Sequence, residues 1–323
     1  MPAPVPETPA EHLARMVQAY TGISTCAGDM EPVCAGASGR CIMRARGVLG
    51  ICWTGARADN HSFLPAAHGL AAAGVRVPAV LAEEQGEAGC GACLVQDLGR
   101  VDLLSLRAAP WEERKAAYRE ALLTLRPLYA LTPDWELQPP FDEALYRWEQ
   151  GYFAEHFIGR HLGGDGAAFT AQPALRRMAA WLASLPRVPV HRDCQSQNIM
   201  LRGGKAWLID FQGMRYGREE YDLASLFCDP YMALSAGERA ELMALRCELG
   251  GAPPDTAVYA ACAMQRLMQA LGAYANIGYN QGRAWYLDCI PPALALLREV
   301  ADTVPADSPA AAVAACLRPL IAA

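Results

Sequence analysis

One segment limits the folds open to this 323-residue chain, because it interrupts a long helical region with strand-like residues. Residues 188–201 and 206–212 contain short apolar stretches followed by polar residues, and Gly203 and Gly204 lie between the two segments. This pattern predicts two short β pieces around a tight turn. The acidic and amide groups at the ends of these pieces are Asp193, Asn198 and Asp210. We expect these three side chains to converge at one point.

Two carboxylates and one amide at a single point suit phosphoryl transfer. The transition state of that reaction needs positioning and charge neutralisation more than covalent help. One amide oxygen and one carboxylate suit Mg²⁺, which keeps few protein ligands beside phosphate oxygens and waters, and we assign this role to Asn198 and Asp210. A separate carboxylate, away from the metal, has to accept the proton of the attacking hydroxyl, and Asp193 fits.

The order and spacing of these residues match the catalytic and metal loops of eukaryotic-type kinases. His191, Arg192 and Asp193 are followed five residues later by Asn198, and Asp210 precedes a phenylalanine after the predicted turn. A bare His-x-Asp is weak evidence, whereas the full set in this order is specific. The alternative, an ordinary polar turn, does not account for both the spacing and the order.

On these residues the chain resembles the aminoglycoside phosphotransferase and choline kinase superfamily. Within it, the chain is most similar to the bacterial anomeric kinases that phosphorylate N-acetylmuramate and N-acetylglucosamine in peptidoglycan recycling. The resemblance covers nearly the whole chain. Its other motifs are the glycine-rich turn at 37–40 with Arg44, and residues 96–99, 148–153, 210–212, 221–226, 265–266 and 286–287.

The resemblance implies an α+β, protein-kinase-like fold with an antiparallel-sheet N-terminal lobe and a mostly helical C-terminal lobe. It also implies ATP in the cleft between the lobes and a substrate hydroxyl delivered from the helical lobe. The pattern itself changes from strand-rich to helix-rich near residue 98, so we expect lobes at 1–98 and 99–323. Strands are expected within 32–53 and around 77–81 and 92–96. Helices are expected at 11–20, 59–73, 111–130, 142–162, 174–184, 236–248, 256–277 and 286–302.

The glycine-rich turn is the candidate phosphate cradle. Gly36 and Gly39 permit a turn whose backbone N–H groups can approach phosphates, with Ser38 and Arg40 beside it. A plain strand hairpin would use the same glycines, and that alternative stays open.

Other residues are assigned through the resemblance. Gln96 and Leu98 belong to the hinge whose backbone groups would bond the adenine edge, while the side chain of Asp97 is expected to be structural. Asp222 lies at the start of a predicted apolar helix, and the simplest interpretation of it is a helix cap. The resemblance implies instead that Asp222 braces the catalytic loop around His191 and Arg192. A carboxylate there can accept backbone N–H groups from that turn, so we favour bracing.

The chain lacks a pair that ordinary kinases carry, namely a lysine on the third strand and a glutamate on the following helix. Residues 48–53 contain no lysine, and the helix at 59–73, which Asp59 is expected to cap, contains no glutamate. Loss of one member would leave an unpaired charge in the cleft, whereas loss of both removes the pair as a unit. This favours a different way of binding the phosphates over a loss of catalytic function. The anomeric kinases that the chain resembles also lack a lysine at this strand, so its absence supports the resemblance. The nearest arginines, each of which can equally be a surface residue, are Arg40, Arg44 and Arg46.

The expected acceptor site is less acidic than a polycationic aminoglycoside needs. Its groups are Gln195, Gln212 and Arg215, which suit a neutral or acidic sugar. Trp148, Tyr152 and Phe153 can each stack on a sugar ring. They can also belong to the core, and helical spacing favours that position for Trp148 and Phe153.

Composition excludes several partners. Lys and Arg number 28 against 34 Asp and Glu, a net charge of −6, which lacks the basic excess of a nucleic-acid binder. No apolar run reaches the roughly 18 residues of a membrane span. The first residues lack the pattern of a secretory signal, so a cytoplasmic protein is expected, and the 12 cysteines, including the pair Cys90 and Cys93, are read as reduced and structural.

These observations predict an ATP- and Mg²⁺-dependent kinase that phosphorylates the anomeric hydroxyl of an N-acetylated amino sugar. One alternative is a kinase of another sugar, an amino alcohol or an aminoglycoside. A second is a non-catalytic nucleotide-binding module, motivated by the missing lysine and glutamate. The sequence leaves open the sugar epimer, the fit of a lactyl group, the residues that replace the missing pair, and the oligomeric state.

Overall fold

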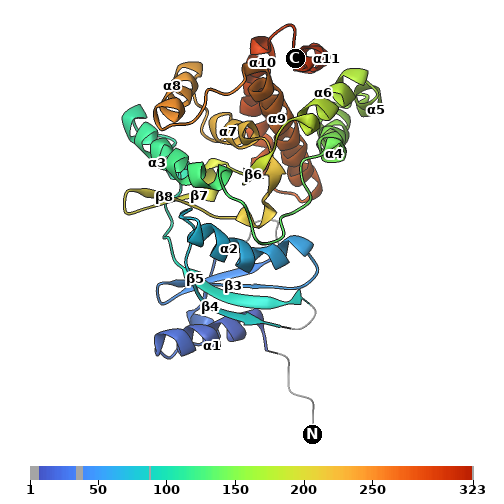
Figure 1. The fold of residues 1–323 in the computed structure, drawn as a ribbon. Coiled ribbons are helices and arrows are strands. Elements are labelled where there is room, and N and C mark those ends of the chain that lie inside the picture. Colours follow the sequence, from blue (N-terminus) through green and yellow to red (C-terminus); the bar gives the residue numbers. More distant parts are fainter. Residues whose placement is uncertain (1–6, 34–38, 87–88, 322–323) are drawn as a thin grey trace.

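A five-stranded antiparallel sheet forms one end of the molecule and helices form most of the rest (Figure 1). The computed structural model describes residues 7–33, 39–86 and 89–321. We call the sheet with its two helices the sheet lobe, and the helix-rich remainder that follows it in the chain the helical lobe. The arrangement is the α+β, two-lobed architecture that the sequence predicts.

The sheet has the strand order β1-β2-β3-β5-β4, with every neighbouring pair antiparallel. Its strands are β1 (Glu31–Pro32), β2 (Cys41–Ala45), β3 (Val48–Trp53), β4 (Val80–Gln85) and β5 (Gly91–Gln96). Arg46 and Gly47 join β2 to β3 with positive φ at both positions, as a tight hairpin turn requires. The strand expected near 77–81 begins only at Val80, since Pro78 has no N–H to offer a sheet partner.

Two helices cover the two faces of the sheet (Figure 1). α1 (Pro9–Thr21) begins at a capping box between Thr8 and Glu11 and buries Leu13 against one face, directly over Gly50. α2 (Phe63–Ala72) covers the other face and separates the sheet from the helical lobe. The apolar core beneath α2 continues without a break from β3 and β5 into the helical lobe, so the lobes share one core.

The start of α2 differs from the sequence expectation. A 3₁₀ turn (Ala58–Ser62) precedes the helix, and the N-cap residue is Ser62, which makes no side-chain capping bond. Asp59 therefore lies a full turn before the helix, and its carboxylate binds Arg57 instead. The prediction that Asp59 caps this helix is wrong, because the residues that read as its first turn form the 3₁₀ turn.

The helical lobe is built around α9 (Thr256–Asn280), most of whose residues are buried. Its other helices are α3 (Trp111–Tyr129), α4 (Glu143–Phe153), α5 (Gly166–Thr170), α6 (Pro173–Ser184), α7 (Glu219–Phe227), α8 (Ala236–Glu248), α10 (Ile290–Thr303) and α11 (Pro309–Ile321). A π-helix (Ala154–His161) extends α4. The alanine-rich segment that forms α11 gave no helix prediction, yet it buries Val313 and Leu317 in the core of this lobe.

Four short strands hold the catalytic segment. β6 (Val188–Val190) pairs with β9 (Arg215–Gly217), and β7 (Ile199–Arg202) pairs with β8 (Lys205–Leu208). Gly203 and Gly204, both at positive φ, form the turn between β7 and β8. The structure thus confirms the two β pieces and the tight turn that the sequence predicts here.

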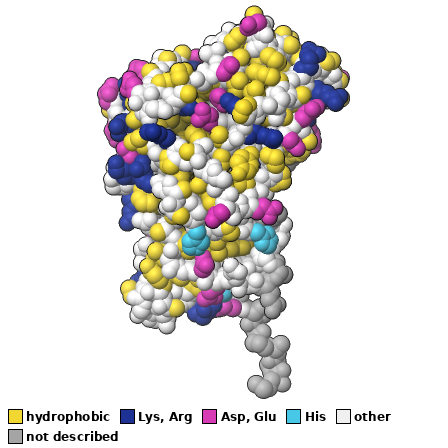
Figure 2. Space-filling model, in the orientation of Figure 1, with side chains coloured by type: hydrophobic (Ala, Val, Ile, Leu, Met, Phe, Trp, Pro, Cys, Tyr) yellow, Lys and Arg dark blue, Asp and Glu magenta, His cyan; other side chains and the backbone are white. Residues whose placement is uncertain are grey.

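The surface is mixed in charge. Figure 2 shows acidic and basic side chains interspersed on one face of the molecule. Among the described residues, no helix combines the length and the hydropathy that crossing a bilayer requires. The described cysteines are all free, with Cys90 exposed and Cys93 buried. No cluster of three or more His, Cys, Asp or Glu side chains in the described ranges is placed to hold a metal ion.

Candidate active site

A cavity of about 460 Å³ lies between the sheet lobe and the helical lobe, and we call it the central cavity. This volume is within the range of small-molecule and cofactor sites. Apolar side chains from both lobes face each other across it, as an aromatic base requires; they are Leu49, Ile51, Val95, Met200 and Ile209. Polar groups gather elsewhere along its wall. The sequence-predicted residues among its lining are Arg40, Gln96, Leu98, Arg192, Asp193, Asn198, Asp210 and Gln212.

The catalytic loop, residues 191–198, is held from behind by Asp222. Its carboxylate accepts the backbone N–H of His191 and that of Arg192, each at 2.7 Å. Arg192 has φ of 77°, a left-handed conformation rare for arginine, which turns both N–H groups toward one carboxylate. Asp222 is the fourth residue of α7 and fully buried, and burial raises its pKa to about 6 against the opposing effect of His191. The contacts are those of a brace, and they do not fit a helix cap.

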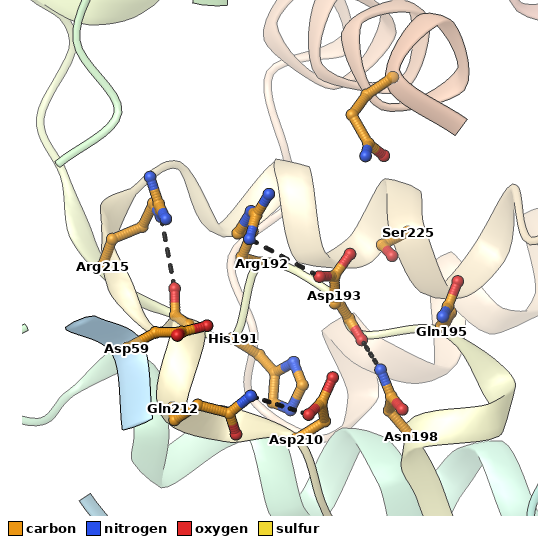
Figure 3. A network of polar contacts seen from close by, with 12 residues as sticks. Asp59, His191, Arg192, Asp193, Gln195, Asn198, Asp210, Gln212, Arg215 and Ser225 are labelled. Atoms are coloured by element: carbon orange, nitrogen blue, oxygen red, sulfur yellow. Dashed lines mark hydrogen bonds and ion pairs between the residues drawn. The ribbon is translucent and has the colours of Figure 1, made fainter. Parts of the chain in front are cut away.

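Both carboxylate oxygens of Asp193 face a guanidinium group, and Figure 3 shows the ion pair with Arg192. Arg266 Nη2 lies 3.5 Å from Oδ1, and Arg192 Nη1 lies 3.9 Å from Oδ2. Burial alone would raise the pKa of Asp193, but the two arginines outweigh it and hold that pKa below its ordinary value. Asp193 is therefore ionised at neutral pH, and with 34% of its side chain exposed it can reach an acceptor.

Asn198 and Asp210 are brought together through the backbone. The Asn198 side chain donates from Nδ2 to the carbonyl of Asp193 at 2.9 Å, which leaves its amide oxygen for another group. Ile209 donates its N–H to the Asn198 carbonyl, and His191 Nε2 donates to the Ile209 carbonyl at 2.9 Å. Asp210 follows at a left-handed φ of 61° and lines the central cavity. One amide oxygen and one carboxylate at the same wall fit Mg²⁺.

The glycine-rich turn is described only at its end. Gly36 and Ser38 lie outside the described residues, whereas Gly39 has a left-handed φ of 67°. Arg40 follows and is only 5% exposed. Its Nη2 donates to Asp210 Oδ1 at 2.6 Å, and its guanidinium lies 5.5 Å over the ring of Phe63. Among the described residues, the buried Arg40 Nε–H has no hydrogen-bond partner, so this donor can serve a ligand.

The other two arginines considered for phosphate binding have different partners. Arg44 binds Asp97 through two contacts of 2.7 and 3.0 Å and also donates to the Gly99 carbonyl. Asp97 accepts the Gly99 N–H as well, which fits the structural part expected of it. Arg46 lies at the surface, 3.6 Å from Asp29.

The three residues predicted to bind the acceptor, Gln195, Arg215 and Gln212, have different partners in the structure. Gln195 Oε1 accepts from Arg266 Nη2 at 3.2 Å, beside the Asp193 carboxylate. Arg215 is 9% exposed, rests over the Phe141 ring and donates to the Gly213 carbonyl; burial lowers its pKa to about 10, so it remains charged at neutral pH. Gln212 instead donates to Asp210 at 2.8 Å, so it lies beside the predicted metal ligand.

The aromatic residues of α4 separate into core and surface. Phe153 is fully buried as expected, but Trp148 is 53% exposed, so its predicted core position is wrong. The buried stripe of α4 consists of Tyr146, Glu149, Gln150 and Phe153. Trp148 lies outside this stripe and stacks on Tyr152, with ring centroids 5.2 Å apart. Tyr152 is half-buried, and its hydroxyl accepts from Asn276 at 2.8 Å.

Sequence reasoning missed four residues near the catalytic loop. Glu149 is fully buried behind Arg192, accepts from Tyr221 and Gln265, and has a pKa raised by burial. It lies within a motif of the resemblance, as does Arg266, but neither was singled out. The remaining two, Arg57 and Asp59, line the central cavity as an ion pair, and no motif pointed to them.

The chain is similar in sequence to bacterial sugar kinases. It is 28% identical over 250 residues to an N-acetylmuramate/N-acetylglucosamine kinase of Pseudomonas putida, a match that covers 74% of this chain and 72% of the relative. A protein of the same description from Neisseria meningitidis is 28% identical over 241 residues, covering 70% of this chain and 71% of the relative.

Solved kinase structures share the fold. A choline/ethanolamine kinase family protein of Mesorhizobium loti has a TM-score of 0.58 at 18% identity, covering 96% of this chain and 98% of its own. The aminoglycoside phosphotransferase APH(3'')-Id of Streptomyces rimosus, in complex with ADP and streptomycin, has a TM-score of 0.54 at 17% identity, covering 79% and 97%. At these identities the likeness concerns the fold, and it confirms the predicted protein-kinase-like architecture.

A family profile matches a large part of the chain directly. The match runs over residues 46–262, from the β2–β3 turn through the catalytic loop and into α9. It spans both lobes and includes Asp193, Asn198 and Asp210. Because it covers well over half of the chain, the protein belongs to the phosphotransferase enzyme family.

Proposed function

We propose that this phosphotransferase moves the γ-phosphate of ATP to the anomeric hydroxyl of an N-acetylated amino sugar of the N-acetylglucosamine or N-acetylmuramate type. The observation that carries the proposal is the meeting of Asp193, Asn198 and Asp210 at one wall of a cavity large enough for a nucleotide. The proposal includes a lobe boundary near residue 98 and a cytoplasmic location, where ATP is available.

Asp193 is the proposed base. The sugar hydroxyl lies beside its carboxylate and gives up its proton to it as the sugar oxygen forms a bond to the γ-phosphorus. The bond between that phosphorus and the bridging oxygen breaks, and ADP leaves with the electron pair. Arg266 and Arg192 hold the carboxylate in place from its two sides.

The residues at the cavity wall would hold the metal and the nucleotide. The amide oxygen of Asn198 and the carboxylate of Asp210 would hold Mg²⁺, which neutralises phosphate charge when bound. The apolar walls would enclose the adenine, with the backbone at Gln96 and Leu98 bonding its edge. Gly39 and Arg40 would approach the phosphates.

The acceptor side of Asp193 supports a sugar over a polycation. Three guanidinium groups, those of Arg192, Arg215 and Arg266, lie around this carboxylate, and their charges would repel a cationic aminoglycoside. Gln195, which shares Arg266 with this carboxylate, adds a neutral group that suits sugar hydroxyls. Tyr152 stays the proposed stacking partner of the sugar ring. The similarity to two N-acetylmuramate/N-acetylglucosamine kinases also favours an amino sugar.

Two alternatives remain distinct from this proposal. The acceptor can be another sugar, an amino alcohol or an aminoglycoside, since the same base and metal residues serve any hydroxyl. A non-catalytic nucleotide-binding module is motivated by the missing lysine and glutamate. Against it, a protein without catalysis has no physical reason to keep a base flanked by two arginines beside a complete pair of metal ligands.

A panel of acceptors tests the proposal. We expect ATP- and Mg²⁺-dependent phosphorylation of N-acetylglucosamine or N-acetylmuramate, and none of the corresponding methyl glycosides, because their anomeric oxygen carries no proton. Radiolabelled ATP with these sugars, choline and one aminoglycoside separates the candidates. Competition by the methyl glycoside against the free sugar is the control for binding. Phosphorylation of a methyl glycoside would move the reaction to another hydroxyl.

A further inference from the structure

The sheet offers no cation at the position where ordinary kinases carry their lysine. The β3 side chains that line the central cavity are Leu49 and Ile51, both apolar. The phosphates of a nucleotide would nevertheless carry several negative charges into this cavity. Positive groups must reach them from another element of the sheet lobe.

Arg57 and Asp59 form such an element directly after β3. Arg57 Nη2 lies 2.7 Å from Asp59 Oδ2, and Arg57 Nε lies 3.0 Å from Asp59 Oδ1, a two-pronged contact. Both residues line the central cavity. Arg57 also runs beside the glycine-rich turn, since its Cδ would lie 3.9 Å from a Cβ placed on Gly39. The pair therefore adjoins the turn that approaches phosphates.

A second arginine–aspartate pair lines the same cavity. Arg40, from the sheet lobe, donates to Asp210, from the helical lobe, and among the described residues its buried Nε–H has no hydrogen-bond partner. Asp59 lies on this side of the catalytic loop, near Gln212 and Asp210 (Figure 3). Burial would raise the pKa of Asp59, but Arg57 and, after it, Arg40 hold it below its ordinary value. Asp59 thus interacts electrostatically with both arginines.

The Arg57–Asp59 pair lies just after the third strand, close in the chain to the positions where ordinary kinases have their lysine–glutamate pair. In ordinary kinases a carboxylate on the helix after the third strand holds a cation toward the phosphates. Here Asp59 lies in the 3₁₀ turn before α2 and holds the guanidinium of Arg57, whose side chain is 48% exposed. A guanidinium can bind a carboxylate with some of its N–H groups and a phosphate with others.

We propose that the Arg57–Asp59 ion pair replaces the absent lysine–glutamate pair, with Asp59 positioning Arg57, and Arg40 beside it, for the phosphates of the nucleotide. This inference rests on the proposed function, because it names how that site holds its nucleotide. Asp59 is a positioning residue, and Arg57 and Arg40 are the groups that contact phosphate. When a nucleotide is bound, its phosphate oxygens supply the acceptor that Arg40 Nε lacks here.

Binding of ATP and of adenosine to matched variants tests the inference. Arg57→Gln and Asp59→Asn are each expected to weaken ATP binding by about 10- to 100-fold, the effect of one charge-assisted hydrogen bond. Adenosine, which has no phosphate, should bind each variant as it binds the wild type. The KM for ATP should rise while the KM for the sugar stays the same. Arg57→Lys keeps the positive charge but loses the planar guanidinium that makes two parallel hydrogen bonds. Its affinity for ATP should lie between those of the wild type and Arg57→Gln.

A double variant and a control sharpen the result. Arg57→Gln combined with Asp59→Asn should cost about as much as one change, because the two residues act as a unit. Glu84→Gln removes the carboxylate of another arginine pair in the sheet lobe, with Arg15, away from the central cavity, and should leave ATP binding unchanged. Thermal unfolding of each variant, together with adenosine binding, shows that the site is folded.

Two outcomes would overturn the inference. One is wild-type affinity for ATP in Arg57→Gln and Asp59→Asn. The other is an equal loss of ATP and adenosine binding, which would mean a structural role. Neither outcome would contradict the proposed function, because that function is tested by phosphorylation of the sugar. Conversely, if the wild type phosphorylates no sugar while these variants lose ATP affinity selectively, the phosphate role stands and the proposed acceptor is wrong.

Discussion

Asparagine in place of Asp193 is expected to lower kcat by about 100- to 10,000-fold, the usual contribution of a positioned general base. An amide cannot accept the proton of the attacking hydroxyl. It also removes the negative charge that Arg266 and Arg192 face from the two sides of the carboxylate. Nucleotide binding should persist, because the apolar walls and the arginines of the sheet lobe do not involve this side chain. Single-turnover kinetics and an ATP-binding isotherm measure the two quantities separately.

The exposed Asp302 provides a control for the Asp193 variant. Asp302 lies on α10, 3.6 Å from Arg318 at the surface, so Asp302→Asn changes the same functional group outside the central cavity. Its kcat should equal that of the wild type. A near-normal kcat in Asp193→Asn would assign the base to another residue, while the fold and the family would be unaffected.

The second large effect is expected at Asp210. Asp210→Asn should lower kcat at least about 100-fold, because a metal at developing charge supplies several kcal/mol and about 1.4 kcal/mol corresponds to tenfold. The change weakens a proposed Mg²⁺ ligand and also removes the charged acceptor that Arg40 and Gln212 share. The measurement is kcat over a range of Mg²⁺ concentrations.

Nucleotide binding with and without Mg²⁺ separates the metal role of Asp210 from a structural one. The wild type should bind ATP more tightly when Mg²⁺ is present, and Asp210→Asn should lose most of that gain. Asn198→Ala is the companion variant, since it removes the other proposed ligand and leaves Asp210 in place. A variant of Asp210 that keeps the full Mg²⁺-dependent gain would contradict the assignment.

The catalytic segment could be predicted because its determinants are local. The hairpin turn at Gly203 and Gly204 needs two positive φ angles, which glycine adopts readily. Two adjacent glycines in the sequence therefore predict it. The order of Asp193, Asn198 and Asp210 along the chain carries the chemistry without reference to distant residues. The sheet strands β2, β3 and β5 follow from short apolar runs broken by glycine in the same way.

The contacts and burial that the sequence did not reveal depend on long-range packing. Arg40 and Asp210 are 170 positions apart, and only the docking of the two lobes brings them to 2.6 Å. An aspartate before an apolar helix predicts a cap, and the sequence does not distinguish a helix start from the 3₁₀ turn in which Asp59 binds Arg57. Trp148 has helical spacing, but the width of the buried stripe on α4 is set by the neighbouring helices α6 and α9.

The departure from ordinary kinases has a physical consequence for the fold. A lysine and a glutamate in the cleft would need each other, because either alone is a costly buried charge. The chain instead places apolar Leu49 and Ile51 on β3 and keeps its charges on arginine–aspartate pairs at the edge of the cavity. Each of these two carboxylates has an arginine partner within the described structure.

The position of the phosphate on the product tests the central claim most directly. Wild-type protein, ATP and Mg²⁺ would be incubated with N-acetylglucosamine and, separately, with N-acetylmuramate, and proton-coupled phosphorus NMR recorded on each product. The account predicts a phosphate signal coupled to the anomeric proton of at least one of the two sugars. A signal coupled to the two protons of the exocyclic carbon or to another ring proton, or no sugar phosphate from either sugar, would contradict it.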